Sequence, residues 1–227
     1  MDIPLGRGVR VDLPSVQTKL VSARRGGYCF EHATLLGAAL RRLGFEVQPH
    51  VGRMTLRVPR TAAPRTHMFL VVHLGEGRFV VDPGFGSWTS RQPLLLDDGG
   101  ALEPTSGYSM VRDGAWWVLR APTPEGTIDG WASTLDEDNT MDAELANYYT
   151  ATHPASPFVN HIMLRAFSVD GKVTVMNREA SFWRGEDKLR TVTLPDRVAL
   201  RALLAEHFGF DLPEIERLRV PAIPEWT

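Results

Sequence analysis

The stretch RRGGYCFEHATLLGAALRRLG, residues 24–44, is the most regular pattern in the sequence. From Cys29 to Leu43, apolar residues recur every three or four positions, which is the period of an α-helix with one buried face. Basic residues stand in its last turn, where cations complement the helix dipole, and Gly44 is suited to end it. The pattern therefore predicts a helix that begins at Cys29.

Cys29 fits either a reactive thiol or a small residue on the buried face of its helix. The first turn of a helix carries partial positive charge that favours a thiolate, and Arg24 and Arg25 add to it if they point inward. Gly26 and Gly27 permit a sharp turn or the close approach of a ligand. Because the chain has one cysteine, an internal disulfide and a Cys-rich zinc site are excluded, and a reducing compartment is expected.

The rest of the chain indicates an α+β fold. Asp12 would cap a short helix over residues 13–23. Beyond Gly44, short β-rich runs are separated by Gly, Pro and Asp. Strands are predicted at 45–54, 68–74, 78–81, 115–119, 159–169, 172–177 and 188–194, and helices at 141–150 and 196–208. Asp170-Gly171 predicts a hairpin turn. Since strands and helices do not alternate strictly, the class is α+β.

A histidine and an aspartate on neighbouring predicted strands are candidates to assist the thiol. A thiolate nucleophile needs a base, and the base needs an orienting group. His67 begins the most apolar strand, and Asp82 ends the next. A hairpin that turns at residues 74–75 would place them directly opposite each other, whereas a turn centred on residues 76–77 would not. The alternative is an Asp facing water and a His satisfied in the core.

Three strings resemble those of the arylamine N-acetyltransferase family. They are RRGGYCFE at residues 24–31, TH at 66–67 and VDPGFG at 81–86. A cysteine at a helix start, followed by His and Asp on adjacent strands, is also the layout of papain-like thiol catalysts. The resemblance runs through the whole chain, including THPASPFVN at 152–160. It implies a papain-like Cys-His-Asp acyltransferase with an N-terminal helical bundle, an antiparallel β-barrel and an α/β lid.

The resemblance also implies domain boundaries and an activity. Residues 1–44 would be a remnant of the helical domain, 45–140 the β-barrel, and 141–227 a linking helix and the lid. The activity would be acetyl-CoA-dependent transfer, through a cysteine thioester, onto arylamines, arylhydroxylamines or arylhydrazines by a ping-pong mechanism. Two alternatives stay open, namely an amide synthase that forms macrolactams with the same triad, and a catalytically impaired homologue that acts as a binding protein.

Residue roles follow from the same resemblance. Cys29 would accept the acyl group, His67 would be the base, and Asp82 its orienting group. Phe85 would line the pocket for the aromatic acceptor. Gly84 and Gly86 would leave room for the pantetheine of acetyl-CoA, although glycines on both sides of Phe85 also fit a bulge or tight corner. No side chains have metal-ligand spacing, so no metal is expected.

The start of the chain departs from the family pattern. Family members carry more residues before the Arg-Gly-Gly string, including a Pro-Phe-Glu-Asn stretch that is absent here, so either the true start lies upstream of Met1 or the N-terminus is shortened. Apolar surface on the Cys29 helix and on residues 13–21 should then be exposed, which is compatible with an oligomer. Glu31 and His32 are expected at exposed positions of the same helix, and the alternative for each is a supporting role beside the site.

Composition argues against macromolecular polyanions as partners. The 227 residues include 25 Lys and Arg and 27 Asp and Glu, for a net charge of −2. This balance provides no basic surface for nucleic acid or for an anionic membrane. Residues 1–10 lack the apolar block of a signal peptide, so export is not expected, and no apolar run reaches the ~20 residues that a spanning helix needs. A cytoplasmic enzyme with small-molecule partners is expected.

Overall fold

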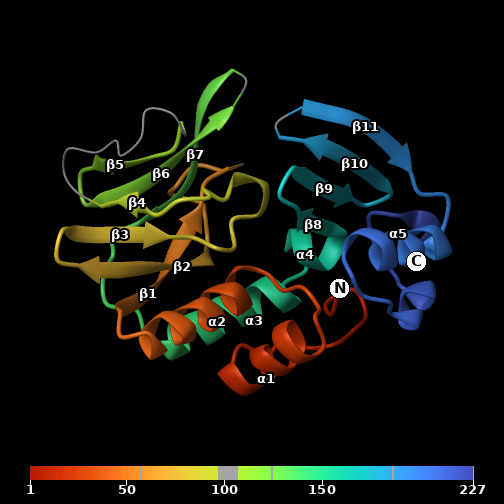
Figure 1. Cartoon of the computed structure of the whole chain (residues 1–227), viewed down its shortest axis with the longest axis horizontal. Helices are drawn as coiled ribbons and strands as arrows, with labels where there is room; N and C mark the ends of the chain where they lie inside the picture. Colours follow the sequence, from red (N-terminus) through yellow and green to blue (C-terminus); the bar gives the residue numbers. More distant parts are fainter. Residues whose placement is uncertain (57, 97–106, 124, 186, 227) are drawn as a thin grey trace. The chain divides into compact units, whose positions relative to one another are not determined.

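The computed structural model describes residues 1–56, 58–96, 107–123, 125–185 and 187–226 (Figure 1). These residues fall into two compact units. The barrel unit comprises Arg10–Leu20 and Gly26–Asn147, and the C-terminal unit comprises Met1–Val9, Val21–Arg25 and Tyr148–Thr227. The chain therefore alternates between the two units before it reaches Gly26. The three-part division at residues 44 and 140 stays a prediction.

The two predicted N-terminal helices form, and the first begins at the cap that the sequence predicts. The Asp12 carboxylate accepts a hydrogen bond from the Ser15 N–H at 3.0 Å and starts α1 (Leu13–Gln17), which continues as a π-helical turn at Thr18–Ser22. Helix α2 (Cys29–Arg42) begins at the cysteine, as predicted. It ends before Gly44, whose φ of +92° favours glycine.

Within the described residues, seven antiparallel strands form a nearly closed barrel. Their order is β4-β3-β2-β1-β7-β6-β5, so two runs of sequential hairpins are joined where β1 pairs with β7. The strands are β1 (Glu46–Met54), β2 (Arg65–Leu74), β3 (Gly77–Val81), β4 (Leu94–Leu95), β5 (Ser109–Asp113), β6 (Trp116–Thr123) and β7 (Gly126–Ser133). A 3₁₀ turn (Gly86–Trp88) follows β3, and α3 (Thr140–Thr152) follows β7.

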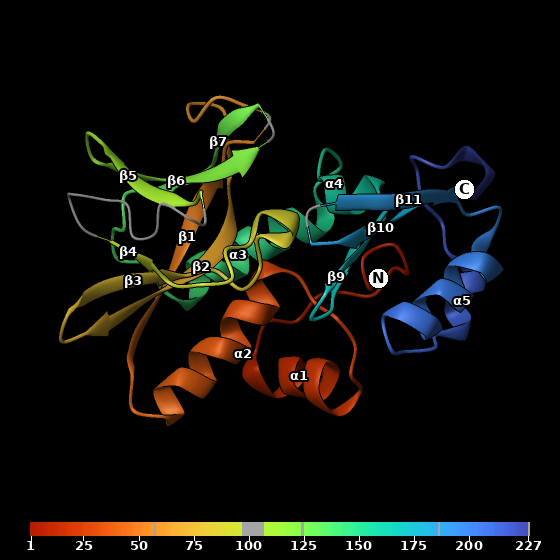
Figure 2. The ribbon, with the colours of Figure 1, turned by 45° about the horizontal axis from the view of Figure 1, so that its top comes forward.

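Strand β2 separates two apolar cores, because successive side chains of a strand point to opposite faces. Met68, Leu70 and Val72 pack with α2, whereas Phe69 and Val71 lie in the barrel interior. Figures 1 and 2 both show α2 running beside β1 and β2. The helix that carries Cys29 is thus held on one face of the strand that carries His67.

The C-terminal unit is a four-stranded antiparallel sheet with a helix on one face. The order is β11-β10-β9-β8. The strands are β8 (Met163–Phe167), β9 (Gly171–Met176), β10 (Glu179–Arg184) and β11 (Asp187–Thr193). Helix α5 (Arg197–His207) buries Leu200 and Leu204 against this sheet. Short 3₁₀ turns at Pro213–Arg217 and Pro224–Trp226 bring Ile215 and Trp226 into the same core.

The predicted α+β class is confirmed, and one predicted strand is wrong at its start. Residues 157–160 form a short helix, α4 (Pro157–Asn160), because the Ser156 hydroxyl accepts the Phe158 N–H at 3.3 Å and Pro157 occupies the first turn. The strand begins only at Met163. Strands β4, β5, β7 and β10 were not predicted.

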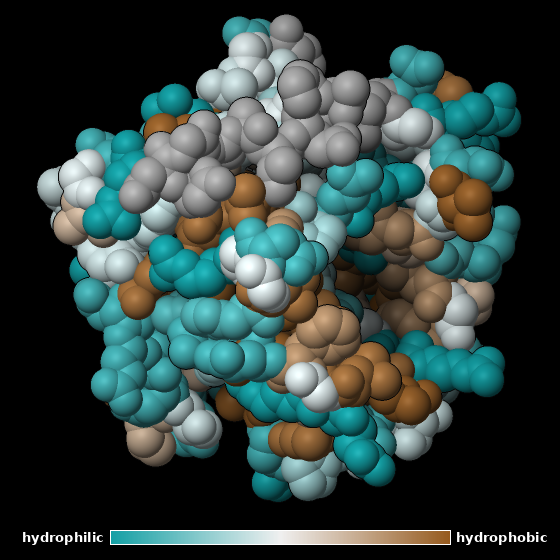
Figure 3. Space-filling view, turned by 60° about the vertical axis from the view of Figure 1, so that its left-hand side comes forward, coloured by the Kyte–Doolittle hydropathy of each residue, from teal (hydrophilic) through white to brown (hydrophobic). Residues whose placement is uncertain are grey.

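Several apolar side chains reach the surface. Leu13 and Val21 are exposed, as the sequence predicted for this segment, whereas Val16 between them is fully buried. Figure 3 shows apolar side chains exposed among polar ones on one face of the molecule. In the described part of the chain, no helix combines the length and the apolar character needed to cross a bilayer.

Candidate active site

The backbone before α2 places Cys29 as the first residue of the helix. Tyr28 is the N-cap in extended conformation, and its N–H donates to the Glu31 carboxylate at 3.2 Å. The Cys29 side chain is buried, with 4% of the residue exposed. Its Sγ lies 3.9 Å from the carbonyl oxygen of Thr66 on β2. The thiol therefore faces the barrel strands and is shielded from bulk water.

Glu31 is buried, which contradicts the expectation that it lies exposed on the helix. Its carboxylate accepts from Lys19 Nζ at 2.5 Å as well as from Tyr28. A Cβ on Gly27 would lie 2.8 Å from Glu31 Oε2, so this glycine is required for the close approach. A carboxylate buried with two donors fixes the loop that leads to the thiol.

His32, one turn along α2 from Cys29, fastens the same loop. Its Nε2 lies 3.1 Å from the carbonyl oxygen of Gly27, and the ring is partly buried, not exposed as the sequence suggested. Burial lowers the pKa of His32, although Glu31 and the Gly27 carbonyl partly oppose this effect. A neutral ring that donates to Gly27 is thus favoured at neutral pH.

His67 and Asp82 are in contact, but the predicted register between their strands is wrong. The hairpin turns at Gly75–Glu76, with Leu74 paired to Gly77, and its last pair is Leu70 with Val81. The two side chains are therefore not directly opposite each other. They meet beyond the end of the ladder, where His67 Nε2 lies 2.7 Å from Asp82 Oδ2.

The Asp82 carboxylate is held by three donors. Trp131 Nε1 on β7 donates to Oδ2 at 2.9 Å, and the Gly84 N–H donates to Oδ1 at 3.1 Å. Together with His67 these contacts fix the plane of a carboxylate that is almost fully buried. Asp82 can therefore orient the imidazole ring without rotating away from it.

The charge environment favours the protonated ring of His67. Burial lowers the pKa of His67, but the Asp82 carboxylate and a hydrogen bond with the Cys29 side chain outweigh burial and raise the pKa to about 10. An imidazolium between two partners that carry negative charge when ionised is therefore expected near neutral pH. This arrangement can store a proton and return it to a reacting group.

The residues after Asp82 pack against the thiol and the imidazole. A Cβ on Gly84 would lie 2.3 Å from Cys29 Cα, so the glycine makes room for the cysteine itself. Phe85 is 6% exposed, and its ring centroid lies 5.3 Å from that of His67. A Cβ on Gly130 would lie 2.6 Å from the Phe85 ring, so β7 also needs a glycine here. Gly86 has a φ of +65°, which fits the tight-corner interpretation.

Trp131 and Lys19 are site residues that sequence reasoning missed. Trp131 lies on β7, whose two glycines and aspartate obscure the strand pattern. A signal was present, because a buried tryptophan needs an acceptor for its N–H and Asp82 needed donors. Lys19 lies in the π-helical turn, and its partner Glu31 was expected at the surface.

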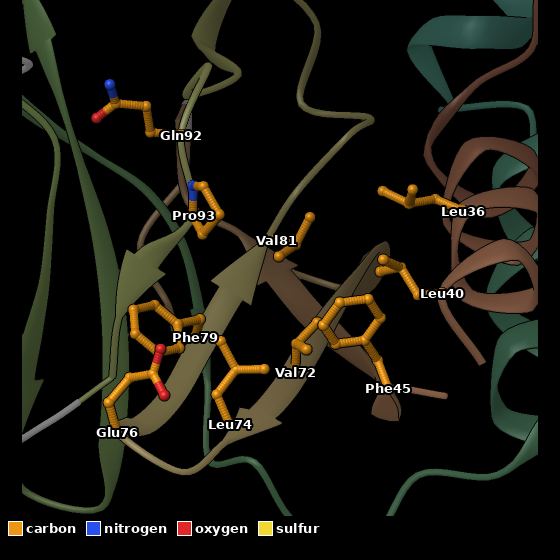
Figure 4. Close-up of a pocket in the computed structure, with 10 residues that line it drawn as sticks. All are labelled: Leu36, Leu40, Phe45, Val72, Leu74, Glu76, Phe79, Val81, Gln92 and Pro93. Carbon is orange, nitrogen blue, oxygen red and sulfur yellow. The ribbon is translucent and has the colours of Figure 1, made fainter. Parts of the chain in front are cut away.

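An apolar groove of about 550 Å³ lies beside α2 but is separate from this site (Figure 4). Leu36 and Leu40 of α2 form one wall, and Phe79 of β3 stands opposite. Its β2 lining residues, Val72 and Leu74, point to the face opposite His67. The groove contains none of the three candidate catalytic residues. Within the described ranges, no cluster of three or more His, Cys, Asp or Glu side chains is arranged to hold a metal ion.

Comparison with known proteins places the chain among acyltransferases. A profile of the N-acetyltransferase family matches residues 1–217. Arylamine N-acetyltransferase of Escherichia coli (strain K12) is 33% identical over 216 residues, which are 94% of this chain and 77% of that protein. The solved structure of arylamine N-acetyltransferase from Salmonella typhimurium superposes with a TM-score of 0.87 at 30% identity, covering 97% of this chain and 81% of that chain. The Mycobacterium marinum arylamine N-acetyltransferase in complex with CoA superposes with a TM-score of 0.85 at 28% identity, over 94% of this chain and 81% of that chain.

The fold thus defines an enzyme of the N-acetyltransferase class. The chain belongs to the arylamine N-acetyltransferase family.

Proposed function

We propose that this protein transfers an acetyl group from acetyl-CoA, through a thioester on Cys29, to the nitrogen or hydroxyl of arylamines, arylhydroxylamines or arylhydrazines. The observation that carries the proposal is the grouping of Cys29, His67 and Asp82, in which His67 Nε2 lies 2.7 Å from Asp82 Oδ2 and the Cys29 side chain helps to raise the pKa of His67. Family membership supports the reaction class, and the CoA bound to the M. marinum relative supports the donor.

In the first half-reaction, the thiolate of Cys29 attacks the thioester carbonyl of the donor. The bond from that carbonyl to the CoA sulfur breaks as the bond to Sγ forms. The imidazolium of His67 gives its proton to the departing CoA sulfur and becomes neutral. Asp82 keeps the ring in the tautomer and orientation that this transfer needs.

In the second half-reaction, the neutral His67 is the base. The acceptor nitrogen attacks the acetyl carbonyl, His67 takes a proton from it, and Cys29 leaves as thiolate. The starting pair of thiolate and imidazolium is restored. Because one thiol and one imidazole serve both halves, CoA leaves before the acceptor reacts, which is a ping-pong mechanism.

Phe85 is proposed to form a wall for the acceptor's aromatic ring. Its closeness to His67 supports this role, since a ring packed on Phe85 would bring its nitrogen near the base. Passage of pantetheine beside Gly84 and Gly86 is proposed as well. The requirement of Gly84 for packing on Cys29 is a separate reason for that glycine.

Intact mass spectrometry after mixing with acetyl-CoA tests the first half-reaction directly. We expect a mass increase of one acetyl group that maps to Cys29, is absent in Cys29→Ala, and is discharged by an arylamine. Arylamine acetylation retained in Cys29→Ala would refute the assignment. A panel of acyl-CoA donors with simple anilines separates the alternatives: no turnover with any pair favours an amide synthase. If Cys29 reacts with iodoacetamide near neutral pH no faster than free cysteine does, the result favours a binding protein.

A further inference from the structure

A β-bulge in β2 sets the position of the histidine. Strands β1 and β2 pair without interruption from Glu46 with His73 to Gly52 with His67, after which Arg53 pairs with Arg65. Thr66 is thus the extra residue of the bulge, directly before His67. A bulge bends its strand and redirects the neighbouring side chains. The carbonyl of the same Thr66 is the group that lies 3.9 Å from Cys29 Sγ.

Arg65 clamps the bulge to the neighbouring strand. Its Nε and Nη2 donate to the Val51 carbonyl of β1 at 3.2 and 3.0 Å. The same Nη2 donates to Asp138 Oδ1. The rigid fork of a guanidinium ties both partners at once, which a lysine ammonium does not reproduce. Arg65, the residue directly before the bulge, is therefore held at a fixed distance from β1.

Asp138 supplies the fixed point for that clamp. Its side chain is 2% exposed, and its Oδ2 accepts from the Val51 N–H at 3.0 Å and lies 3.3 Å from His50 Nδ1. Burial raises the pKa of Asp138, but His50, the Val51 N–H and Arg65 outweigh burial, so that the pKa is lowered. A buried, ionised carboxylate with donors on both oxygens has one preferred orientation.

The backbone of Val51 depends on the side chains of Asp138 and Arg65 for its hydrogen bonds. The described pairing of β1 with β7 is confined to Arg53 and Met54. At Val51 the N–H and the carbonyl are instead satisfied by Asp138 and Arg65. The two side chains therefore replace backbone pairing at Val51, which the described ladder between β1 and β7 does not reach.

We propose that Arg65 and Asp138 are positioning residues of the acetyl transfer, which hold the Thr66 bulge so that His67 and the Thr66 carbonyl face Cys29. The inference rests on the proposed function for its catalytic readout. Neither side chain contacts the reacting atoms, and both act through the bulge. Misplacing a base by about 1 Å lowers rates by up to about a hundredfold.

The test compares Arg65→Met, Arg65→Lys and Asp138→Asn with wild type. Arg60→Met is the matched control, because Arg60 pairs with Asp113 at 2.8 Å in the same unit and is similarly exposed, 34% against 40% for Arg65. Three readouts are taken: the thermal unfolding midpoint, kcat and KM for acetyl-CoA, and the iodoacetamide alkylation rate of Cys29 between about pH 5 and about pH 9.

We expect Arg65→Met and Asp138→Asn to lower kcat about tenfold to a hundredfold in folded protein, with KM for acetyl-CoA changed less than about twofold. The alkylation profile should move to higher pH, because the thiolate loses an aligned imidazolium. Arg65→Lys should recover part of the loss, and Arg60→Met should match wild type.

Two outcomes overturn the proposal. The first is that Arg65→Met and Arg60→Met give the same kcat and alkylation profile. The second is that activity in every variant falls only in proportion to its unfolded fraction. If wild type forms no acetyl adduct, the proposed function fails separately, and the alkylation profiles decide the positioning role. If Arg65→Met does not fold, Arg65→Lys and Asp138→Asn decide it.

Discussion

At the scale of single residues, the Asp82 carboxylate accepts hydrogen bonds from His67 and Trp131, which are distant in sequence. A substitution of Trp131 tests this arrangement. Trp131→Phe removes the N–H that donates to Asp82 Oδ2 and keeps an aromatic ring against Phe69. A buried acceptor with a lost donor should lower the free energy of unfolding by about 1–3 kcal/mol and loosen the orientation of His67, so that kcat falls. Urea unfolding and steady-state acetylation measure the two effects.

Trp183→Phe is the control for that substitution. It also removes a tryptophan hydrogen bond, the one from Nε1 to the Thr174 hydroxyl at 3.2 Å, but in the C-terminal unit. Equal losses of kcat in the two variants would contradict a specific role for Trp131.

The choice of histidine is tested with His67, His73 and Asp82. The alkylation rate of Cys29 against pH is measured for wild type, His67→Gln, His73→Gln and Asp82→Asn. His67→Gln should move the profile to higher pH, and Asp82→Asn should lower the transfer rate by about 10²–10⁴-fold through loss of tautomer control. His73 lies on β2 with its Nδ1 4.0 Å from Glu46, so His73→Gln should resemble wild type. The reverse pattern for the two histidines would show that His67 is not the base.

Gly84 is predicted to tolerate no side chain. In Gly84→Ala the new Cβ would meet Cys29 Cα at 2.3 Å, so the backbone on one side must move. We expect a loss of stability of about 1–3 kcal/mol from overpacking and a transfer rate lower by about tenfold or more. Gly75→Ala is the control, since a Cβ on Gly75 would meet no other atom within 4 Å. A Gly84→Ala enzyme with wild-type kcat would contradict the packing argument.

The raised pKa of His67 predicts how stability depends on pH. The pKa rises from 6.5 in the unfolded chain to about 10 in the fold, so the folded state binds the proton more tightly. This stabilisation is complete below about pH 6.5 and is lost as the pH rises through about 10. The free energy of unfolding of wild type minus that of His67→Gln should therefore shrink between about pH 6 and about pH 10, by on the order of a few kcal/mol. Urea titrations at several pH values measure it, and a constant or growing difference contradicts it.

At the scale of elements, the N-cap of α5 makes a separable contribution. Asp196 accepts the Ala199 N–H at 2.8 Å, at the start of the helix that buries Leu200 and Leu204. Asp196→Ala should lower the free energy of unfolding by about 0.5–2 kcal/mol, whereas Asp196→Asn keeps a capping oxygen and should cost less. Chemical unfolding followed by circular dichroism compares them, and equal losses in both variants would rule out capping as the cause.

Elements with strong local signals were predictable, and those defined by distant pairing were not. Helix α2 has an apolar period, basic residues in its last turn and a terminal glycine within its own sequence. The β2–β3 hairpin was predicted, but its register depends on a turn at Gly75–Glu76 that the sequence did not distinguish from a turn one residue earlier. Strand β7 pairs with β1, which lies far earlier in the chain, as Ala132 with Arg53. Its glycines weaken the strand pattern in the sequence, and the reason for one of them, room for the Phe85 ring beside Gly130, is visible only in the structure.

At the scale of the whole molecule, the sequence identified the three candidate catalytic residues but not the residues that hold them in place. Cys29, His67 and Asp82 stand in short strings that resemble a family, so their identity did not depend on a correct fold. Asp138 and Trp131 enter only through the long-range pairing of β1 with β7, which brings β7 and the segment after it beside β1. Such contacts are set by global topology, which local patterns do not encode.

The division of the chain between its two units has a consequence for synthesis. Met1–Val9 and Val21–Arg25 belong to the C-terminal unit, where Asp2 pairs with Arg25 and Arg7 with Glu214. The ribosome makes these segments before most of the barrel unit, yet the sheet and α5 of their own unit emerge after it. The barrel unit can therefore fold during translation. Met1–Val9 and Val21–Arg25 have no folded unit to pack against until the segment from Tyr148 onward has been made. A protease present during translation should cut Met1–Val9 and Val21–Arg25 far more readily than it cuts the same segments in the folded protein.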